Sequence, residues 1–162
     1  MPNNDTLYTT AWLDLAAAPV LVGVPRIDER YWSVALMDLF TNNFAMLGSR
    51  LDGAGPVQAL LVGPAWHGQA PPGMRVIRAP SNDVWLLGRW LIDGPQDAPA
   101  VHAIQDALRV DVQRPADGGF RRIETRGNPD VHLVLRGGER GPNYSARDVA
   151  RAAELTSMLG LA

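Results

Sequence analysis

The sequence predicts a mainly β protein of the α+β class: an antiparallel β-sandwich or jelly-roll-like sheet with two helices and a C-terminal βα appendage. Two observations predict the strands. Short runs of alternating apolar and polar residues recur at about ten-residue spacing, and turn-forming residues separate them. A third observation predicts the helices, because the apolar spacing changes after residue 96 to the three- and four-residue steps of a helix.

Six or seven short strands are expected in the first 92 residues. The run 6–15 alternates between two faces, one carrying Leu7 and Leu13 and the other Tyr8 and Trp12. The other strands are bounded by turn residues, and they cover residues 20–24, 29–39, 42–48, 57–62, 74–79 and 84–92. Strands at this spacing predict an antiparallel meander folded into a sandwich or open barrel.

A helix is expected over residues 97–109, where apolar residues recur at helical spacing after a capping Asp97. Residues 120–125 and 131–135 are expected strands, and a second helix is expected to begin at Ser145. The chain is therefore predicted to divide into a β-rich domain over residues 1–112, a linker over 113–119 and a C-terminal βα segment over 120–162.

Composition and charge exclude several classes of function. The net charge is −2, and all 15 basic residues are Arg, so no strong field favours nucleic acid or an anionic membrane as a partner. The absence of Cys excludes disulfides, thiolate catalysis and cysteine metal sites. The three His are far apart in the sequence, so no metal and no cofactor is expected. Without a leader peptide or a long apolar run, a cytoplasmic location is expected.

Two clusters of Asn and Asp form the best candidate site. Each lies at one end of an alternating run, and the clusters comprise Asn3, Asn4 and Asp5 in the first and Asp38, Asn42 and Asn43 in the second. If the two runs share a sheet, these polar groups are expected to converge at one edge of an apolar body. With Tyr8, the four Asn side chains are the expected contacts of a polar small-molecule ligand.

Asp5 and Asp38 are the carboxylates that could pair for acid–base catalysis, which needs one carboxyl kept protonated and one ionised. Tyr8, Trp12 and Trp32 are expected to supply the apolar wall that raises one of the two pKa values. The alternative is structural, because Asp and Asn at strand ends commonly hydrogen-bond their own turns.

Two arginines also have alternative interpretations. Arg89 either lines a pocket or lies on the solvated side of its strand with its stem over Trp85. Arg136, followed by two Gly and by the N-terminus of the helix at Ser145, could bind a phosphate, since helix N-termini attract anions. The simpler interpretation of Arg136 is a solvated strand end.

The first two thirds of the chain carry four long motifs: PNNDTLYTTAWLDL, YWSVALMDLFTNNFAMLGSR, LLVGPAW and SNDVWLLGRWLIDG, the last followed by the helix VHAIQDALRV. With these motifs, residues 2–110 resemble the bacterial domain-of-unknown-function 1254 family. The resemblance implies a β-rich, jelly-roll-like domain, often paired with a second uncharacterised domain. It supplies no settled activity.

The C-terminal segment carries the motifs GNPDVH, LRGG and PNYSA. Residues 126–162 thereby resemble a fragment of class I DAHP synthase, the metal-dependent TIM-barrel enzyme that opens the shikimate pathway. The resemblance implies that Arg136 contacts a substrate phosphate. Synthase activity is not expected, because the family's cysteine ligand is absent and one βα unit cannot close an eight-unit barrel. Two unrelated fragments indicate a chimera, a recombined or frameshifted reading frame, or a designed sequence.

Two main hypotheses of function follow, beside a third in which the tail is a vestigial phosphate-binding segment at Arg136. The first is a small-molecule-binding or hydrolase-like β domain with the Asn and Asp clusters at the mouth of its site. The second is a non-catalytic interaction or structural module, or a chimeric protein without retained activity. Such a module could form a homo-oligomer by pairing an exposed sheet edge with another chain.

Overall fold

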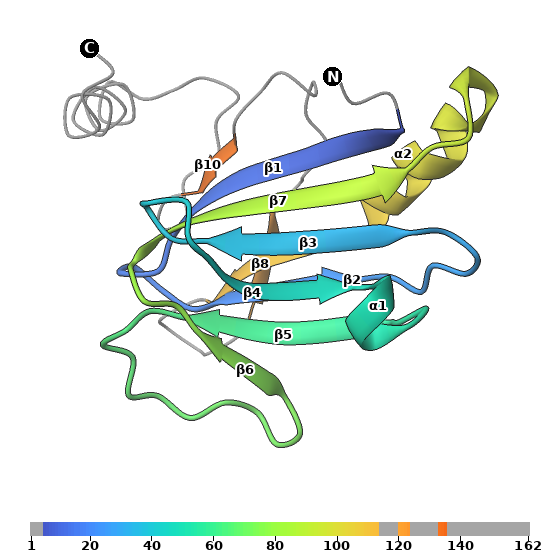
Figure 1. Ribbon diagram of the computed structural model, residues 1–162. Coiled ribbons are helices and arrows are strands. Elements are labelled where there is room, and N and C mark those ends of the chain that lie inside the picture. The colour runs from blue at the N-terminus through green and yellow to red at the C-terminus, as the bar shows by residue number, and fades with distance from the viewer. Residues whose placement is uncertain (1–4, 114–119, 124–132, 136–162) are drawn as a thin grey trace, which may run out of the picture.

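The computed structural model describes residues 5–113, 120–123 and 133–135, which form two β-sheets packed face to face (Figure 1). Sheet A has the strand order β10-β1-β7-β3-β4. Its strands are β1 (Thr6–Asp14), β3 (Trp32–Met37), β4 (Asn43–Gly48), β7 (Asp83–Leu91) and β10 (Leu133–Leu135). Sheet B has the order β6-β5-β2-β8-β9. Its strands are β2 (Val20–Val24), β5 (Val57–Val62), β6 (Arg75–Arg78), β8 (Arg109–Gln113) and β9 (Phe120–Ile123).

The predicted β-sandwich is confirmed, but the predicted meander is wrong. In sheet A, β1 pairs with β7, and β7 pairs with β3, so neighbours in the sheet are far apart in the sequence. Two of the pairings are parallel, β5 with β6 and β1 with β10. The predicted bounds of β2 and β5 match the structure, whereas β8 was not predicted at all.

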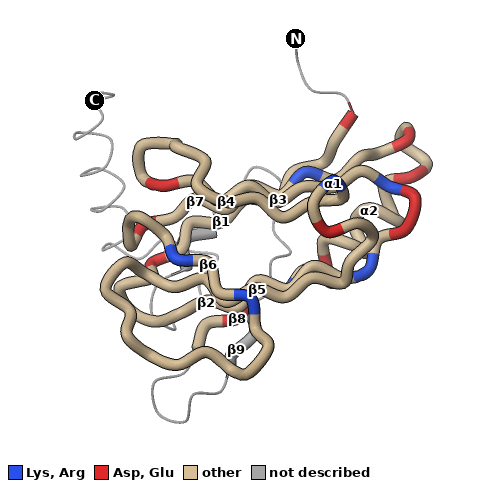
Figure 2. The backbone as a smooth tube through the Cα atoms, turned by 60° about the horizontal axis from the view of Figure 1, so that its bottom comes forward, with Lys and Arg blue, Asp and Glu red and all other residues tan. Residues whose placement is uncertain are grey.

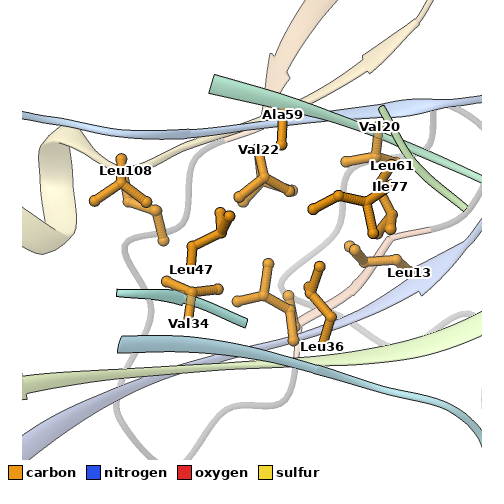
Figure 3. Packing of buried hydrophobic residues seen from close by; sticks show 14 of the residues in the cluster. Leu13, Val20, Val22, Val34, Leu36, Leu47, Ala59, Leu61, Ile77 and Leu108 are labelled. Atoms are coloured by element: carbon orange, nitrogen blue, oxygen red, sulfur yellow. The ribbon is translucent and has the colours of Figure 1, made fainter. Parts of the chain in front are cut away.

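The core lies between the two sheets (Figure 3). Alternation along each strand sends every second side chain inward, so that Leu13 and Leu36 of sheet A point toward Val22 and Leu61 of sheet B. All four side chains are buried. Burial of one such side chain contributes roughly 1.5–3 kcal/mol to the free energy of unfolding, so this layer is the main stabilising element.

Short helices complete the fold. Helix α1 (Ser49–Asp52) follows β4, a 3₁₀ helix covers Pro95–Asp97, and helix α2 (Ala98–Ala107) lies within the predicted helix 97–109. Gln105 of α2 donates from Nε2 to the carbonyl oxygen of Tyr8 at 2.9 Å and to Oγ1 of Thr9 at 3.2 Å, which fixes the helix to β1. The helix predicted at Ser145 lies outside the described residues.

The C-terminal part of the chain adds one edge strand to each sheet. Strand β9 pairs antiparallel with β8, and the three residues of β10 pair parallel with the end of β1. The division into a domain, a linker and a C-terminal segment stays a prediction. Within the described residues, no helix combines the length and the apolar character needed to cross a lipid bilayer.

Candidate functional site

Asp5, the described member of the first predicted cluster, and the second cluster of Asp38, Asn42 and Asn43 lie at opposite ends of sheet A. Strands β1 and β3 both run antiparallel to β7, so they point in the same direction. Asp5 precedes β1, and its carbonyl oxygen accepts a hydrogen bond from the amide of Ile92 at 2.9 Å, just beyond the end of β7. Asp38 follows β3, next to the beginning of β7. The expected convergence of Asp5 and Asp38 is therefore wrong, and their catalytic roles stay a prediction without a shared site.

Asp38 organises the turn that joins β3 to β4. Its Oδ1 accepts hydrogen bonds from the backbone amides of Phe40 at 2.9 Å and Asn42 at 2.8 Å, and its Oδ2 accepts one from Nδ2 of Asn42 at 2.9 Å. These bonds, first that from the Asn42 side chain, lower the pKa of Asp38 although its burial opposes the shift. Asp38 is thus held ionised by its own turn, which favours the structural alternative.

Asn43 also has a local structural environment. It lies at the irregular pairing between Leu36 and Met37, where β4 carries a bulge. With its amide nitrogen turned toward the backbone, Asn43 donates to the carbonyl oxygens of Ala45 at 2.8 Å and Leu36 at 3.2 Å. Of the other predicted site residues, Asn3, Asn4 and Arg136 lie outside the described residues.

Tyr8 lies on the face of sheet A that is turned away from sheet B, which we call the outer face. The strand registers place its residues in cross-strand rows. The rows are Tyr8–Arg89–Ser33–Gly48, Thr10–Leu87–Ala35–Met46 and Trp12–Trp85–Met37–Asn43.

A stacked tryptophan pair lies on the outer face. The rings of Trp12 and Trp85 are stacked, with 5.7 Å between centroids and 11° between planes. The indole nitrogen of Trp85 donates to Oγ1 of Thr10 at 2.9 Å. Both Trp side chains are only half-buried, so a rigid aromatic pair faces outward. Trp32, expected to form an apolar wall with Tyr8 and Trp12, is instead fully buried in the core opposite Trp90.

Arg89 lies on the same face of β7 as Trp85, two rows away and opposite Tyr8. Its guanidinium carbon is 5.6 Å from the centroid of the Tyr8 ring, which is the geometry of a cation–π contact. The residue is exposed, and the salt bridges found in the described part of the chain do not include it. The predicted solvated position of Arg89 is confirmed, but it lies over Tyr8 rather than Trp85.

One end of the outer face is raised. In Figure 1 the turn that joins β3 to β4 passes in front of the end of sheet A where β7 begins. In Figure 2 the same turn rises above sheet A on the side away from sheet B. The outer face therefore carries the Trp12–Trp85 pair beside a projecting turn.

The described residues offer no alternative centre for metal chemistry, since they contain no group of three His, Asp or Glu residues close enough to hold an ion. The outer face was not found from the sequence as a site. The alternation in the sequence placed Tyr8 and Trp12 on one face of their strand, and Trp85 and Arg89 on one face of another. Nothing in the local sequence shows that these two strands are neighbours.

Similarity to known proteins supports the family resemblance and the fold. The model of the family described as "Protein of unknown function (DUF1254)" matches residues 1–112. The crystal structure of the VPA0106 protein from Vibrio parahaemolyticus is 34% identical, with a TM-score of 0.67, and the match covers 80% of this chain and 33% of that chain. The chain thus spans a third of that protein.

Short stretches also match phospho-2-dehydro-3-deoxyheptonate aldolases, the DAHP synthases. The Haemophilus influenzae enzyme is 59% identical over 29 residues, which are 18% of this chain and 8% of that enzyme. The Tyr-sensitive enzyme of Escherichia coli is 49% identical over 44 residues, 27% of this chain and 12% of that enzyme. Both resemblances predicted from the motifs are confirmed.

Proposed function

The chain belongs to the DUF1254 family of proteins of unknown function, and we propose that its β-sandwich is a protein-interaction module whose binding surface is the outer face. The observation that carries the proposal is the composition of that face. Trp, Tyr, Arg and Met are the residues enriched at the centres of protein interfaces, and all four occur here. The residues concerned are Tyr8, Trp12, Met37, Met46, Trp85 and Arg89.

Rigidity of the face supports the same function. The Trp12–Trp85 stack and the hydrogen bond from Trp85 to Thr10 hold both indoles in one arrangement before any partner arrives. Binding then loses little side-chain entropy, which is a large part of the cost of association. Leu91 and Met46 extend the apolar surface, with 37% and 39% of their surface exposed.

A hydrolase-like function has less support. General acid–base catalysis needs two groups within hydrogen-bond reach of one reacting centre, and Asp5 and Asp38 lie at opposite ends of sheet A. A small-molecule ligand stays a prediction, for which Tyr8 and Asn43 are the described predicted contacts in the rows of the outer face. The side chains of Asn42 and Asp38 already form a hydrogen bond with each other, in place of one to a ligand.

Site-specific photo-cross-linking in the producing cells tests the proposal. A benzophenone amino acid replaces Leu87, in the middle of the outer face, or Val76, an apolar control on β6 of sheet B. Leu87 is half-buried and Val76 is 43% exposed, so both positions accept a large side chain. We expect protein adducts from position 87 and few from position 76.

Adducts that form equally at both positions, or at position 76 alone, would contradict the outer face as the interaction surface. The cross-linked species is identified by mass spectrometry of the adduct peptides. The melting temperature of each labelled protein, measured beside the unlabelled chain, verifies that the sandwich is intact.

A further inference from the structure

We propose that the partner of the outer face is the outer face of a second copy of this chain, packed antiparallel to it. This inference rests on the proposed function, because it names the partner of the same surface. It differs from an oligomer built by pairing sheet edges, since the strands of the two copies face each other instead of extending one sheet.

The charges on the outer face of one copy are complementary to those on the outer face of a second copy. Among the cross-strand rows of β1, β3, β4 and β7, the charged residues are Arg89 toward one end and the pair Asp14 and Asp83 at the other. The distance along β7 from Asp83 to Arg89 is about 20 Å. A two-fold axis that lies between the two faces and crosses β7 midway therefore brings Arg89 opposite Asp83 of the partner subunit. Asp14 of the partner subunit is one strand away.

The same axis matches the apolar rows. The row of Trp85 and the row of Leu87 lie on either side of the midpoint of β7, so each row faces the other row of the second copy. Aromatic rings then contact aliphatic side chains across the interface in place of like groups. Because the interface is isologous, every such contact forms twice.

Shape selects the antiparallel arrangement. The β3–β4 turn projects from the outer face at the Asp83 end (Figure 2). In a parallel arrangement both projecting turns would lie at the same end of the interface. In the antiparallel arrangement each turn lies at the Arg89 end of the other copy, on the side of β3 and β4.

The size of the surface limits the strength of the dimer. Two strands of nine residues and two of six give roughly 400 Å² per copy and about 800 Å² in total. That total lies below the range of stable interfaces, so a weak, concentration-dependent dimer is expected. The bulge beside Met37 at the sheet edge β4 makes edge pairing the less suitable alternative.

Sedimentation velocity of charge-reversed variants of the full chain tests the arrangement. Over an about hundredfold concentration range, the wild type should shift from monomer to dimer. Arg89→Glu places an acidic group against Asp83 of the partner subunit, and Asp83→Arg places a cation against Arg89 of the partner subunit. Each variant alone should dimerise at least roughly tenfold more weakly. An equimolar mixture of the two should restore dimerisation, because only the heterodimer has opposite charges at both ends.

Asp14→Arg serves as a second acidic-end variant, and Arg26→Glu, exposed after β2 of sheet B, is the matched control that should leave dimerisation unchanged. A chain that is monomeric throughout, a dimer indifferent to both reversals, or a mixture that stays monomeric would each overturn the inference. If position 87 cross-links to a different protein while the chain is monomeric, the inference fails and the proposed function stands. If position 87 gives no more adducts than position 76, both fail.

Discussion

Thr41 has a left-handed backbone conformation, with φ of 64°, in the turn between β3 and β4. The turn needs this conformation, because the amide of Thr41 donates to the carbonyl oxygen of Asp38 and the chain must then return to β4. A β-branched residue is strained there, whereas Asn adopts the conformation readily. We expect Thr41→Asn to raise the free energy of unfolding by about 1 kcal/mol in urea denaturation. Thr41→Val keeps the strain and should give no gain; a stabilised Val variant would contradict the explanation.

Asp38 accepts three hydrogen bonds within the same turn. Asp38→Ala leaves two backbone amides and one side-chain amide without their acceptor, so its melting temperature should fall below that of Asp38→Asn, which retains one acceptor oxygen. Thermal unfolding followed by circular dichroism measures both variants. If Asp38→Ala had the melting temperature of the wild type but lost binding of a ligand, Asp38 would be a site residue and not a turn residue.

Gly88 makes room for the indole of Trp90 in the core. A Cβ atom at position 88 would lie 3.0 Å from Cζ2 of Trp90 and 3.3 Å from Cβ of Thr9. Trp90 cannot easily move, because its nitrogen donates to Oγ1 of Thr9 at 2.9 Å. Gly88→Ala should therefore cost roughly 1–3 kcal/mol of unfolding free energy. The cost should be smaller in a Trp90→Phe background, and an equal cost in both backgrounds would exclude this clash as the cause.

At the scale of elements, an ion pair joins the segment before β3 to the start of α2. The guanidinium of Arg30 binds both carboxylate oxygens of Asp97, and Nη2 is 2.8 Å from Oδ1. Arg30 also donates to the carbonyl oxygen of Leu91, at the end of β7. The sequence placed Asp97 as the cap of α2, and it does occupy that position, but its side chain bonds Arg30 and the amide of Asp93 instead of the helix.

This ion pair predicts a stability change in acid. The Arg30 hydrogen bond, helped by the Asp93 amide, lowers the pKa of Asp97 from 3.8 to about 2. A lowered folded-state pKa stabilises the protein above the unfolded value, and the contribution is lost as pH falls through the folded value. The melting temperature of the wild type should exceed that of Asp97→Asn at pH 7, and the difference should vanish between pH 4 and about pH 2. A difference that persists at the lowest pH would contradict this assignment.

Elements with a strong local pattern were predictable, and those defined by pairing were not. Strands β2 and β5 are short apolar runs between Pro or Gly residues, so their bounds follow from local chemistry. Strand β8 follows α2 almost directly, and its Val110 and Val112 continue an apolar pattern that resembles the end of the helix. Only its pairing with β2 makes it a strand.

The candidate site fails to follow from the sequence for a related reason. The first Asn and Asp cluster precedes its strand, and the second follows its strand. These clusters could converge only if β1 and β3 ran in opposite directions. Both strands instead flank β7 and run the same way, and that direction is set by pairings between residues more than 40 positions apart. No local propensity encodes such a pairing.

At the scale of the whole molecule, a truncated chain tests the predicted division. A protein of residues 1–113 retains β1 to β8 and both α-helices. Its near-ultraviolet circular dichroism should still show the ordered Trp side chains of the sandwich. Its melting temperature should be lower than that of the full chain, because β1 and β8 lose their edge partners. A truncated protein without tertiary signal would show that the C-terminal segment belongs to the domain.

The position of β7 between β1 and β3 also governs how the protein is made. Ribosomes release the chain from its N-terminus, so β1, β3 and β4 emerge before the strand that joins β1 to the other two. Until residue 91 has left the exit tunnel, β3 can pair only with β4, and β1 has no hydrogen-bonding neighbour in the nascent chain. A pause in translation just before β7 would prolong this interval, and the newborn polypeptide would then depend most on chaperones.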